Sequence, residues 1–154
     1  MPPGERKYTL DTNLFIRGFR EPEANAALVR FHAAFAPFEY LSVVVAQELR
    51  AGTRRPADRR RLERELLDVF ERSGRIITPS ARAWQESGDV LATLATREGL
   101  EPGRVSKAFA NDVLLGLSCR EAGVTLITEN VADFARISRV VPVPYIAPWP
   151  GAAG

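Results

Sequence analysis

The chain has 154 residues, of which 45% are hydrophobic and 26% charged, and its formal net charge is +2. This apolar content excludes an intrinsically disordered chain, and one cysteine beside one histidine excludes an internal disulfide and a four-ligand Cys/His zinc site. No apolar run approaches the roughly 20 residues that span a bilayer, and no signal-peptide core follows the start. We therefore expect a single domain over residues 1–154, located in the cytoplasm and not bound to a membrane.

Apolar periodicity, capping residues and helix breakers predict strands that alternate with helices. In chain order we expect a strand at 7–10, helices at 14–20 and 22–36, a strand at 38–42, helices at 43–50 and 56–72, a strand at 75–78, helices at 81–97 and 111–122, and strands at 124–128 and 140–143. Ser42 and Ser80 are expected to cap the helices that follow them, while Gly52, Gly99 and Gly123 are expected to end helices.

The predicted strands are nearly all apolar, which is typical of parallel strands buried on both faces. Together with the alternating order, this predicts an α/β, doubly wound fold with a central, mostly parallel sheet of about four to five strands and helices on both faces. Trp84 is expected to be a core anchor and Cys119 a small core residue. Residues 144–154 include three prolines and are expected to form a loosely held tail, in which Trp149 would be the docking group.

Several acidic residues lie where the predicted strands end. Asp11 directly follows the first strand, and Glu48 lies in the helix after the second. Asp112 is expected to open the helix before the fourth strand, and Glu129, Asn130 and Asp133 follow that strand. Because ligands of parallel sheets bind at the carboxyl ends of strands, we expect these side chains to converge on one crevice.

Converging carboxylates repel one another unless a cation compensates them, and an all-oxygen site selects Mg²⁺ or Mn²⁺. Such a site would activate a water molecule for attack on a phosphate, without any side-chain nucleophile. The chain lacks a Gly-x-Ser-x-Gly elbow and a phosphate-binding glycine-rich loop, and its only cysteine and only histidine are Cys119 and His32. These absences favour metal-dependent phosphate hydrolysis.

Four segments in this order resemble PIN-domain ribonucleases, in particular the VapC toxins of bacterial type II toxin–antitoxin pairs. The likeness covers nearly the whole chain, and it rests on Tyr8-Thr-Leu-Asp-Thr-Asn-Leu-Phe-Ile16, Val45-Ala-Gln-Glu-Leu49, Asn111-Asp-Val-Leu-Leu-Gly-Leu-Ser118 and Thr125-Leu-Ile-Thr-Glu-Asn-Val-Ala-Asp-Phe134. The resemblance implies RNA as the substrate, Mg²⁺ or Mn²⁺ as the cofactor, a homodimer, and a VapB-type antitoxin that covers the active site.

The resemblance also implies roles for individual residues. Asp11, Glu48 and Asp112 would be the acidic core of the metal site, with Asp133 as the fourth carboxylate. Supporting polar residues would be Asn13, Thr128 and Asn130. Asn130 stands where many relatives have an acid, so the resemblance leaves open whether Asp133 or Asn130 completes the site and whether one or two metal ions bind.

Basic residues cluster after Glu48. Between residues 50 and 64 there are seven arginines against two acids, a local net charge of +5. We predict that these and two outlying basic residues contact the RNA backbone, the candidates being Arg17, Arg50, Arg54, Arg55, Arg59, Arg60 and Lys107. The alternative is a solvated helix face, the usual explanation of a charge run.

Other readings of these motifs are open. Asp11 and Asp112 would each serve equally well as helix caps. A two-component receiver is disfavoured because the chain lacks the acidic pair that ends the first strand of a receiver. A haloacid dehalogenase phosphatase is disfavoured because it needs an Asp-x-Asp motif where this chain has Asp11-Thr12-Asn13. The alternatives to a toxin are a catalytically inactive PIN-like module that binds RNA or protein, and a PIN nuclease that serves in RNA processing.

Overall fold

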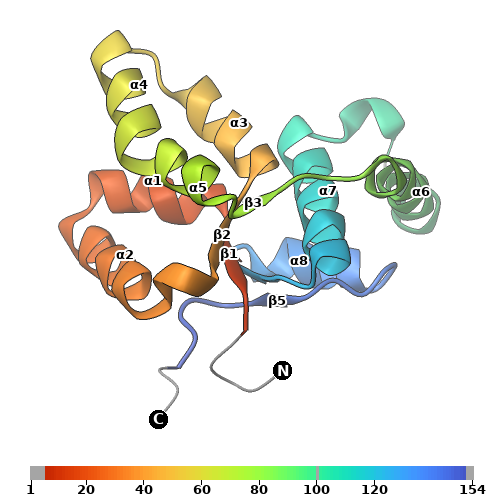
Figure 1. Ribbon diagram of the computed structural model, residues 1–154. Coiled ribbons are helices and arrows are strands. Elements are labelled where there is room, and N and C mark those ends of the chain that lie inside the picture. Colours follow the sequence, from red (N-terminus) through yellow and green to blue (C-terminus); the bar gives the residue numbers. More distant parts are fainter. Residues whose placement is uncertain (1–5, 100, 152–154) are drawn as a thin grey trace.

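A five-stranded parallel sheet forms the centre of the computed structural model, which describes residues 6–99 and 101–151 (Figure 1). The strands are β1 (Tyr8–Leu10), β2 (Glu39–Ser42), β3 (Ile76–Ile77), β4 (Thr125–Ile127) and β5 (Tyr145–Ile146). Their order across the sheet is β3-β2-β1-β4-β5, and every neighbouring pair is parallel. The predicted α/β fold class is thus confirmed.

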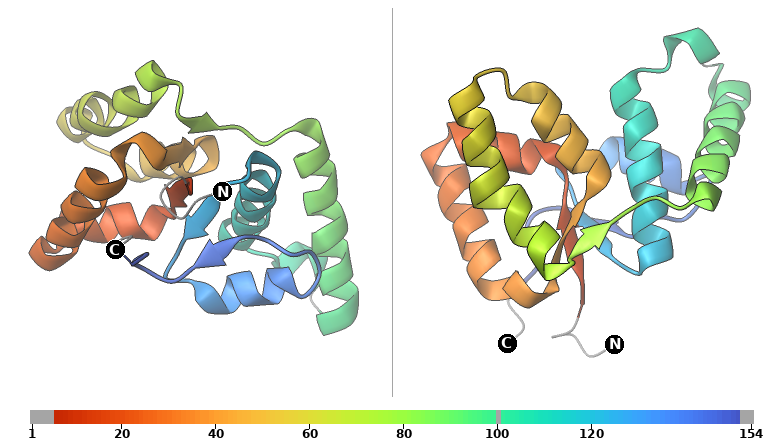
Figure 2. Two further views of the ribbon diagram at one scale, coloured as in Figure 1. Left: turned by 60° about the horizontal axis from the view of Figure 1, so that its bottom comes forward. Right: turned by 45° about the horizontal axis from the view of Figure 1, so that its top comes forward.

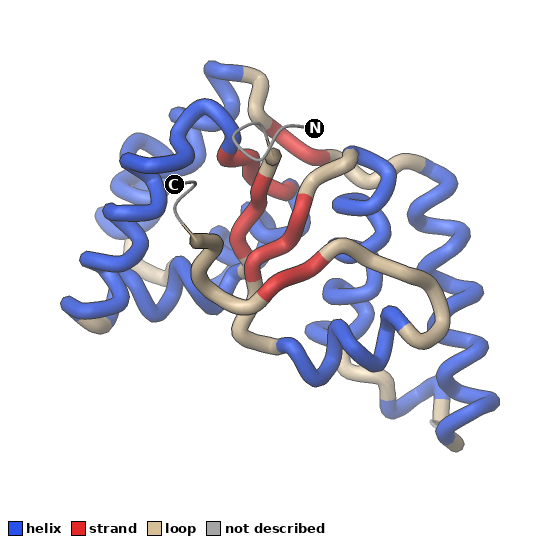
Figure 3. Tube along the Cα trace, turned by 90° about the horizontal axis from the view of Figure 1, so that it is seen from below, coloured by secondary structure: helices blue, strands red, loops and turns tan. Residues whose placement is uncertain are grey.

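The helices form two groups, one on each side of the sheet, as the views in Figures 2 and 3 show. The first group comprises α1 (Thr12–Arg20), α2 (Pro22–Phe35), α3 (Val43–Gly52), α4 (Pro56–Leu62) and α5 (Asp68–Ser73), and the second comprises α6 (Ala81–Glu98), α7 (Lys107–Ala122) and α8 (Val131–Ser138). A π turn, Glu63–Leu67, joins α4 to α5, so the helix predicted at 56–72 exists but is interrupted.

The predicted caps explain where several helices begin and end. Ser42 Oγ accepts a 3.1 Å hydrogen bond from the Val44 amide, and Ser80 Oγ accepts one of the same length from the Ala83 amide. Gly99 follows α6 and Gly123 follows α7, both with the positive φ that favours glycine. The serine caps place α3 and α6 directly after the strand and the loop that precede them.

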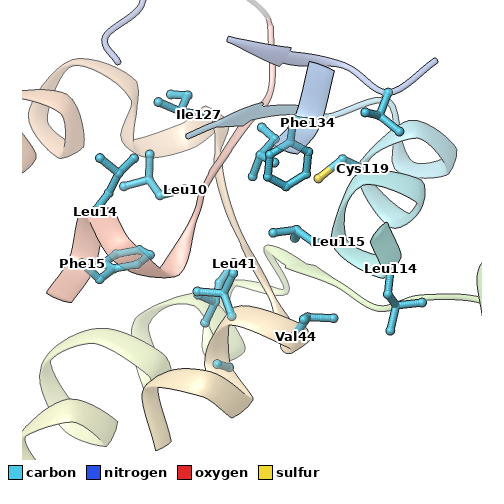
Figure 4. Packing of buried hydrophobic residues seen from close by; sticks show 14 of the residues in the cluster. Leu10, Leu14, Phe15, Leu41, Val44, Leu114, Leu115, Cys119, Ile127 and Phe134 are labelled. Atoms are coloured by element: carbon cyan, nitrogen blue, oxygen red, sulfur yellow. The ribbon is translucent and has the colours of Figure 1, made fainter. Parts of the chain in front are cut away.

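The hydrophobic core lies between the strands and both helical groups (Figure 4). Leu10, Leu115, Ile127 and Phe134 are fully buried, since helices cover both faces of the sheet. Cys119 is also fully buried, as expected, and burial raises the pKa of its thiol.

The core position predicted for Trp84 is wrong, because its side chain is 61% exposed. Helix α6 packs mainly on α7 and buries Ala83, Val90 and Leu94 on that side. Trp84 lies on the outer flank of the helix. The apolar residues of α6 therefore extend around more of the helix than the face that α7 buries.

The C-terminal end of the chain differs from the prediction, both in the last strand and in the tail. Residues 140–143 are not a strand: Val143 packs instead on Gly116 of α7, where an added Cβ would meet Val143 Cγ1 at 3.2 Å. The edge strand β5 lies within the predicted tail, and Trp149 packs on Phe31 with ring centroids 5.2 Å apart. The tail is therefore held in place at β5 and Trp149, and residues 152–154 lie outside the described part. Over the described ranges, no helix is both long enough and apolar enough to cross a membrane.

Candidate active site

Asp11 lies at the centre of the site because it follows β1, the middle strand. Its backbone N–H continues the β1–β4 ladder with a 3.0 Å hydrogen bond to the Ile127 carbonyl. The side chain is only 5% exposed and caps α1, with Oδ1 accepting a 2.8 Å bond from the Thr12 amide. Oδ2 accepts a 2.7 Å bond from Thr128 Oγ1, which lies just after β4. The carboxylate is therefore fixed from two neighbouring strands.

Glu48 reaches the same edge of the sheet from α3. The N-cap at Ser42 starts this helix at the end of β2, next to β1. Glu48 Oε1 accepts a 3.0 Å hydrogen bond from Thr12 Oγ1. Thr12 thus connects Glu48 to Asp11. This role was not predicted from the sequence, in which the only signal for it is the position of Thr12 directly after Asp11.

Asn130 joins the two remaining carboxylates. Its Nδ2 donates to Asp112 Oδ2 at 3.2 Å and to Asp133 Oδ2 at 2.9 Å, while its backbone N–H donates to Thr128 Oγ1 at 3.0 Å. The expectation that Asp112 opens its helix is wrong: α7 begins at Lys107 after the N-cap Ser106, and Asp112 lies further along it. Asp112 therefore has no capping role.

The pKa of three of these carboxyl groups, Asp112, Asp11 and Glu48, is raised. Burial and then the charges of Asp11, Glu48 and Asp133 raise the pKa of Asp112 to about 8, while the Asn130 hydrogen bond opposes the shift. Burial also raises the pKa of Asp11, and burial together with the Asp11 charge raises that of Glu48. Lys107 lowers the pKa of Glu48 only in part. In the residues that the structure describes, no lysine or arginine forms an ion pair with Asp11, Glu48, Asp112 or Asp133, which are together called the carboxylate cluster below.

The donor set suits a hard divalent cation, because it consists of carboxylate oxygens that repel one another. In the part of the chain that the structure describes, however, no three Asp, Glu, His or Cys side chains form a ready group of metal ligands. The amide of Asn130 donates hydrogen bonds to both Asp112 and Asp133.

Other residues predicted for the site are placed differently. Asn13 is exposed and takes no part in the hydrogen bonds around Asp11, where Thr12 acts instead. Glu129, which follows β4, pairs with Arg17 and does not join the carboxylate cluster.

The arginines predicted to bind RNA fall into two groups. Arg50 pairs with Glu63 at 2.7 Å and Glu71 at 3.0 Å, Arg59 pairs with Glu63 at 3.1 Å, and Arg17 pairs with two glutamates. Arg54, Arg55 and Arg60 are exposed, and within residues 6–99 and 101–151 no carboxylate pairs with them. Arg54, Arg55 and Arg60 are therefore the arginines that are available to bind an external anion.

Comparisons with known proteins agree with this fold. Similar solved structures include FitAcB from Neisseria gonorrhoeae (22% identity, TM-score 0.66, 92% of this chain and 98% of that chain) and DNA-bound VapBC from Salmonella typhimurium (20%, 0.66, 92% and 98%). A toxin–antitoxin complex from Klebsiella pneumoniae is also similar (24%, 0.58, 93% and 98%). No curated protein matches the sequence significantly. The sequence model of the PIN domain matches residues 8–140, and the chain therefore belongs to the PIN domain family of nucleases.

Proposed function

We propose that this protein is a metal-dependent endoribonuclease and the toxin of a type II toxin–antitoxin pair. The main support is the carboxylate cluster, in which the N-cap of α1 and one residue each of α3, α7 and α8 lie near one another beside the ends of β1, β2 and β4. A group of like charges that is partly buried costs stability, so its presence supports a functional role. Its all-oxygen chemistry favours phosphate hydrolysis with a divalent cation.

Asp11, Glu48, Asp112 and Asp133 are the residues that would hold Mg²⁺ or Mn²⁺. A cation bound there would supply the positive charge that stabilises the attacking and leaving oxygens of a phosphodiester. Thr128 fixes the orientation of Asp11 through its 2.7 Å hydrogen bond, and Thr12 joins Asp11 to Glu48. Asn130 joins Asp112 and Asp133 through the two hydrogen bonds that its Nδ2 donates.

RNA is proposed as the substrate because exposed basic side chains adjoin α3, the helix that contains Glu48. Arg54, Arg55 and Arg60 lie at the turn between α3 and α4 and along α4, without carboxylate partners in the described chain. Lys107 lies within electrostatic range of Glu48. These groups would bind phosphates on either side of the cleaved bond.

The partners are proposed from the similar structures, which are toxin–antitoxin complexes by description. We infer that a VapB-type antitoxin binds this chain, that the chain forms a homodimer, and that it acts on RNA in the cytoplasm. The all-parallel fold shared with those complexes over more than nine-tenths of this chain supports the inference.

Cleavage of a mixed pool of structured RNAs tests the proposal. The purified full chain, freed of any copurifying partner, is incubated with Mg²⁺, Mn²⁺ or a chelator, beside Asp11→Asn and the control Asp89→Asn on the exposed face of α6. We expect metal-dependent cuts from the wild type and Asp89→Asn and none from a folded Asp11→Asn. Absence of cutting by the folded wild type in every condition would instead indicate an inactive binding module.

A further inference from the structure

One arginine joins the three helices on the second side of the sheet. Arg136, in the last turn of α8, donates a hydrogen bond from Nε to the Glu98 carboxylate at the end of α6. Its guanidinium also lies over the ring of Phe109 in the first turn of α7, 5.0 Å from the ring centroid. The Arg136 side chain is 25% exposed and Phe109 is buried, so water weakens these contacts only in part. Arg136, Glu98 and Phe109 are called the helix clamp below.

The helix clamp lies about one helical turn from the carboxylate cluster on both α7 and α8. Phe109 precedes Asp112 by three positions in α7, and Arg136 follows Asp133 by three positions in α8. Residues three apart on a helix are neighbours on its surface. The contact between Arg136 and Phe109 therefore joins the same two helices as the hydrogen bonds of Asn130, about one turn away from them.

Arg136 does not make the ion pair that its place in the sequence allows. An arginine three positions after an aspartate on a helix can pair with that aspartate. In the described ranges, however, the carboxylate that pairs with Arg136 is Glu98, while Asp133 accepts a 2.9 Å hydrogen bond from Asn130. Arg136 thus attaches α8 to its neighbours and leaves Asp133 to the carboxylate cluster.

The start of α7 needs an attachment because it follows a connection without a regular helix or strand in its described residues. This connection runs from Glu98 to the N-cap Ser106 and contains a 3₁₀ turn, Pro102–Arg104. Glu98 and Phe109 lie at its two ends, and Arg136 contacts both. Arg136 therefore restricts how far the first turns of α7 can move from α8.

We propose that Arg136 is a positioning residue, which holds α7 and α8 at the spacing at which Asn130 bridges their two carboxylates. Arginine suits this role because its planar guanidinium can stack on a ring and pair with a carboxylate at the same time. Without it the first turns of α7 would move, and Asp112 would lose its 3.2 Å hydrogen bond from Asn130 Nδ2. The proposal rests on the metal site proposed above and adds a residue that orients two of its ligands.

The side-chain amide of Asn130 is the readout of the test. The ¹⁵N-labelled full chain is compared with Arg136→Gln in metal-free buffer, and the Asn130 NH₂ signals are assigned by their absence from Asn130→Ala. We expect these signals to shift in Arg136→Gln and to return toward their wild-type positions in Arg136→Lys, which keeps a positive charge over the ring. Glu98→Gln, which removes only the paired carboxylate, should shift them in the same direction and serves if Arg136→Gln does not fold.

The matched control is Arg82→Gln, which removes the 2.8 Å ion pair of Arg82 with Glu86 within α6. It should leave the Asn130 signals unchanged. Calorimetric titration with Mn²⁺ should show affinity about tenfold or more weaker in Arg136→Gln than in the wild type, and no change in Arg82→Gln. A purely stabilising role of Arg136 would lower the Tm and move neither measurement.

Two outcomes would overturn the proposal. One is that the Asn130 signals keep their wild-type positions in the folded Arg136→Gln and Glu98→Gln variants. The other is that the wild type and Arg136→Gln bind Mn²⁺ equally well. The amide signals are recorded without metal or RNA, so they test the helix clamp separately from the nuclease function. A wild type that neither binds Mn²⁺ nor cuts RNA would remove that function, whereas a shift at Asn130 would still support the positioning role.

Discussion

Thr128 Oγ1 donates a 2.7 Å hydrogen bond to Asp11 Oδ2, although 117 positions separate the two residues. Both side chains are almost fully buried, and the same Thr128 oxygen accepts the backbone N–H of Asn130. One hydroxyl thus positions Asp11 on one side and, through Asn130, Asp112 and Asp133 on the other. The carboxylate cluster depends on a residue that has no charge of its own.

Replacing Thr128 by valine should impair the cluster without removing a carboxylate. Loss of the hydroxyl leaves Asp11 Oδ2 without its buried donor, which costs about 1–3 kcal/mol of the free energy of unfolding. Loss of such a supporting group weakens metal affinity by about 10–100-fold. Calorimetric titration with Mn²⁺ and urea unfolding measure the two effects. Thr128→Ser keeps the hydroxyl and serves as the control, and equal Mn²⁺ affinity of both variants would contradict this role.

Replacing Asp112 by asparagine should abolish RNA cleavage and stabilise the protein. The folded pKa of about 8 lies above the ordinary 3.8, so between these values the folded chain binds the proton more tightly than the unfolded chain does. The free energy of unfolding of the wild type therefore falls as the pH rises from about 4 to about 8. The Asp112→Asn variant does not lose stability in this way, because its side chain has no carboxyl group to titrate. At pH 8 its free energy of unfolding should therefore exceed that of the wild type by on the order of 1 kcal/mol or more.

Thermal unfolding of Asp112→Asn and the wild type at pH 5 and pH 9 measures this difference. We expect a higher Tm for the variant at pH 9 and a smaller gap at pH 5. The control is Asp89→Asn, which changes an exposed carboxylate on α6. A variant that is less stable than the wild type at pH 9 and still cuts RNA would contradict the assignment of Asp112.

Replacing Asn130 by aspartate should tighten metal binding. The substitution removes the amide that bridges Asp112 and Asp133 and adds one more carboxylate to the carboxylate cluster. Titration with Mn²⁺ should show about tenfold or greater affinity, or a second bound ion, together with a lower Tm in the presence of a chelator. Asn130→Ala, which removes the bridge without adding a carboxylate, is the control. Equal Mn²⁺ binding by both variants would show that the added charge has no effect.

Neutralising Arg54, Arg55 and Arg60 together should weaken RNA binding. Each phosphate contact contributes about 0.7 to the slope of log affinity against log salt for single strands, so the slope should decrease in magnitude by about 2. Filter binding of RNA by the Asp11→Asn protein over a salt series measures this slope without cleavage. The control neutralises three exposed arginines on the other side of the sheet, namely Arg97, Arg120 and Arg139. Unchanged affinity would place the RNA elsewhere.

The sheet and the placement of Asp11 and Glu48 at one edge of it were predictable because both follow from local signals. Asp11 directly follows an apolar strand, and Ser42 caps the helix that contains Glu48. In a parallel sheet these positions lie at one edge whatever the details of packing. The placement of these residues therefore needed no knowledge of side-chain contacts.

Features that depend on packing between distant elements were not predictable. An apolar pattern around α6 cannot indicate that α7 covers only one flank and leaves Trp84 exposed. Similarly, Arg50 of α3 pairs with Glu63 in the π turn and with Glu71 in α5. The sequence pattern predicted one regular helix over 56–72 and gave no sign of these contacts between helices. The arginine run therefore resembled a uniform RNA-binding surface although some of its members hold helices together.

The pairing of β1 with β4 also determines when the protein becomes complete during its synthesis. Tyr8 pairs with Thr125, so β1 has no neighbour on that side until the last quarter of the chain has left the ribosome. Asp11 then gains Thr128, and Asp112 gains Asn130, only after most of the polypeptide has been made. If the proposed ribonuclease function holds, we expect this order of assembly to keep the nascent chain inactive beside the ribosome and the messenger that produce it.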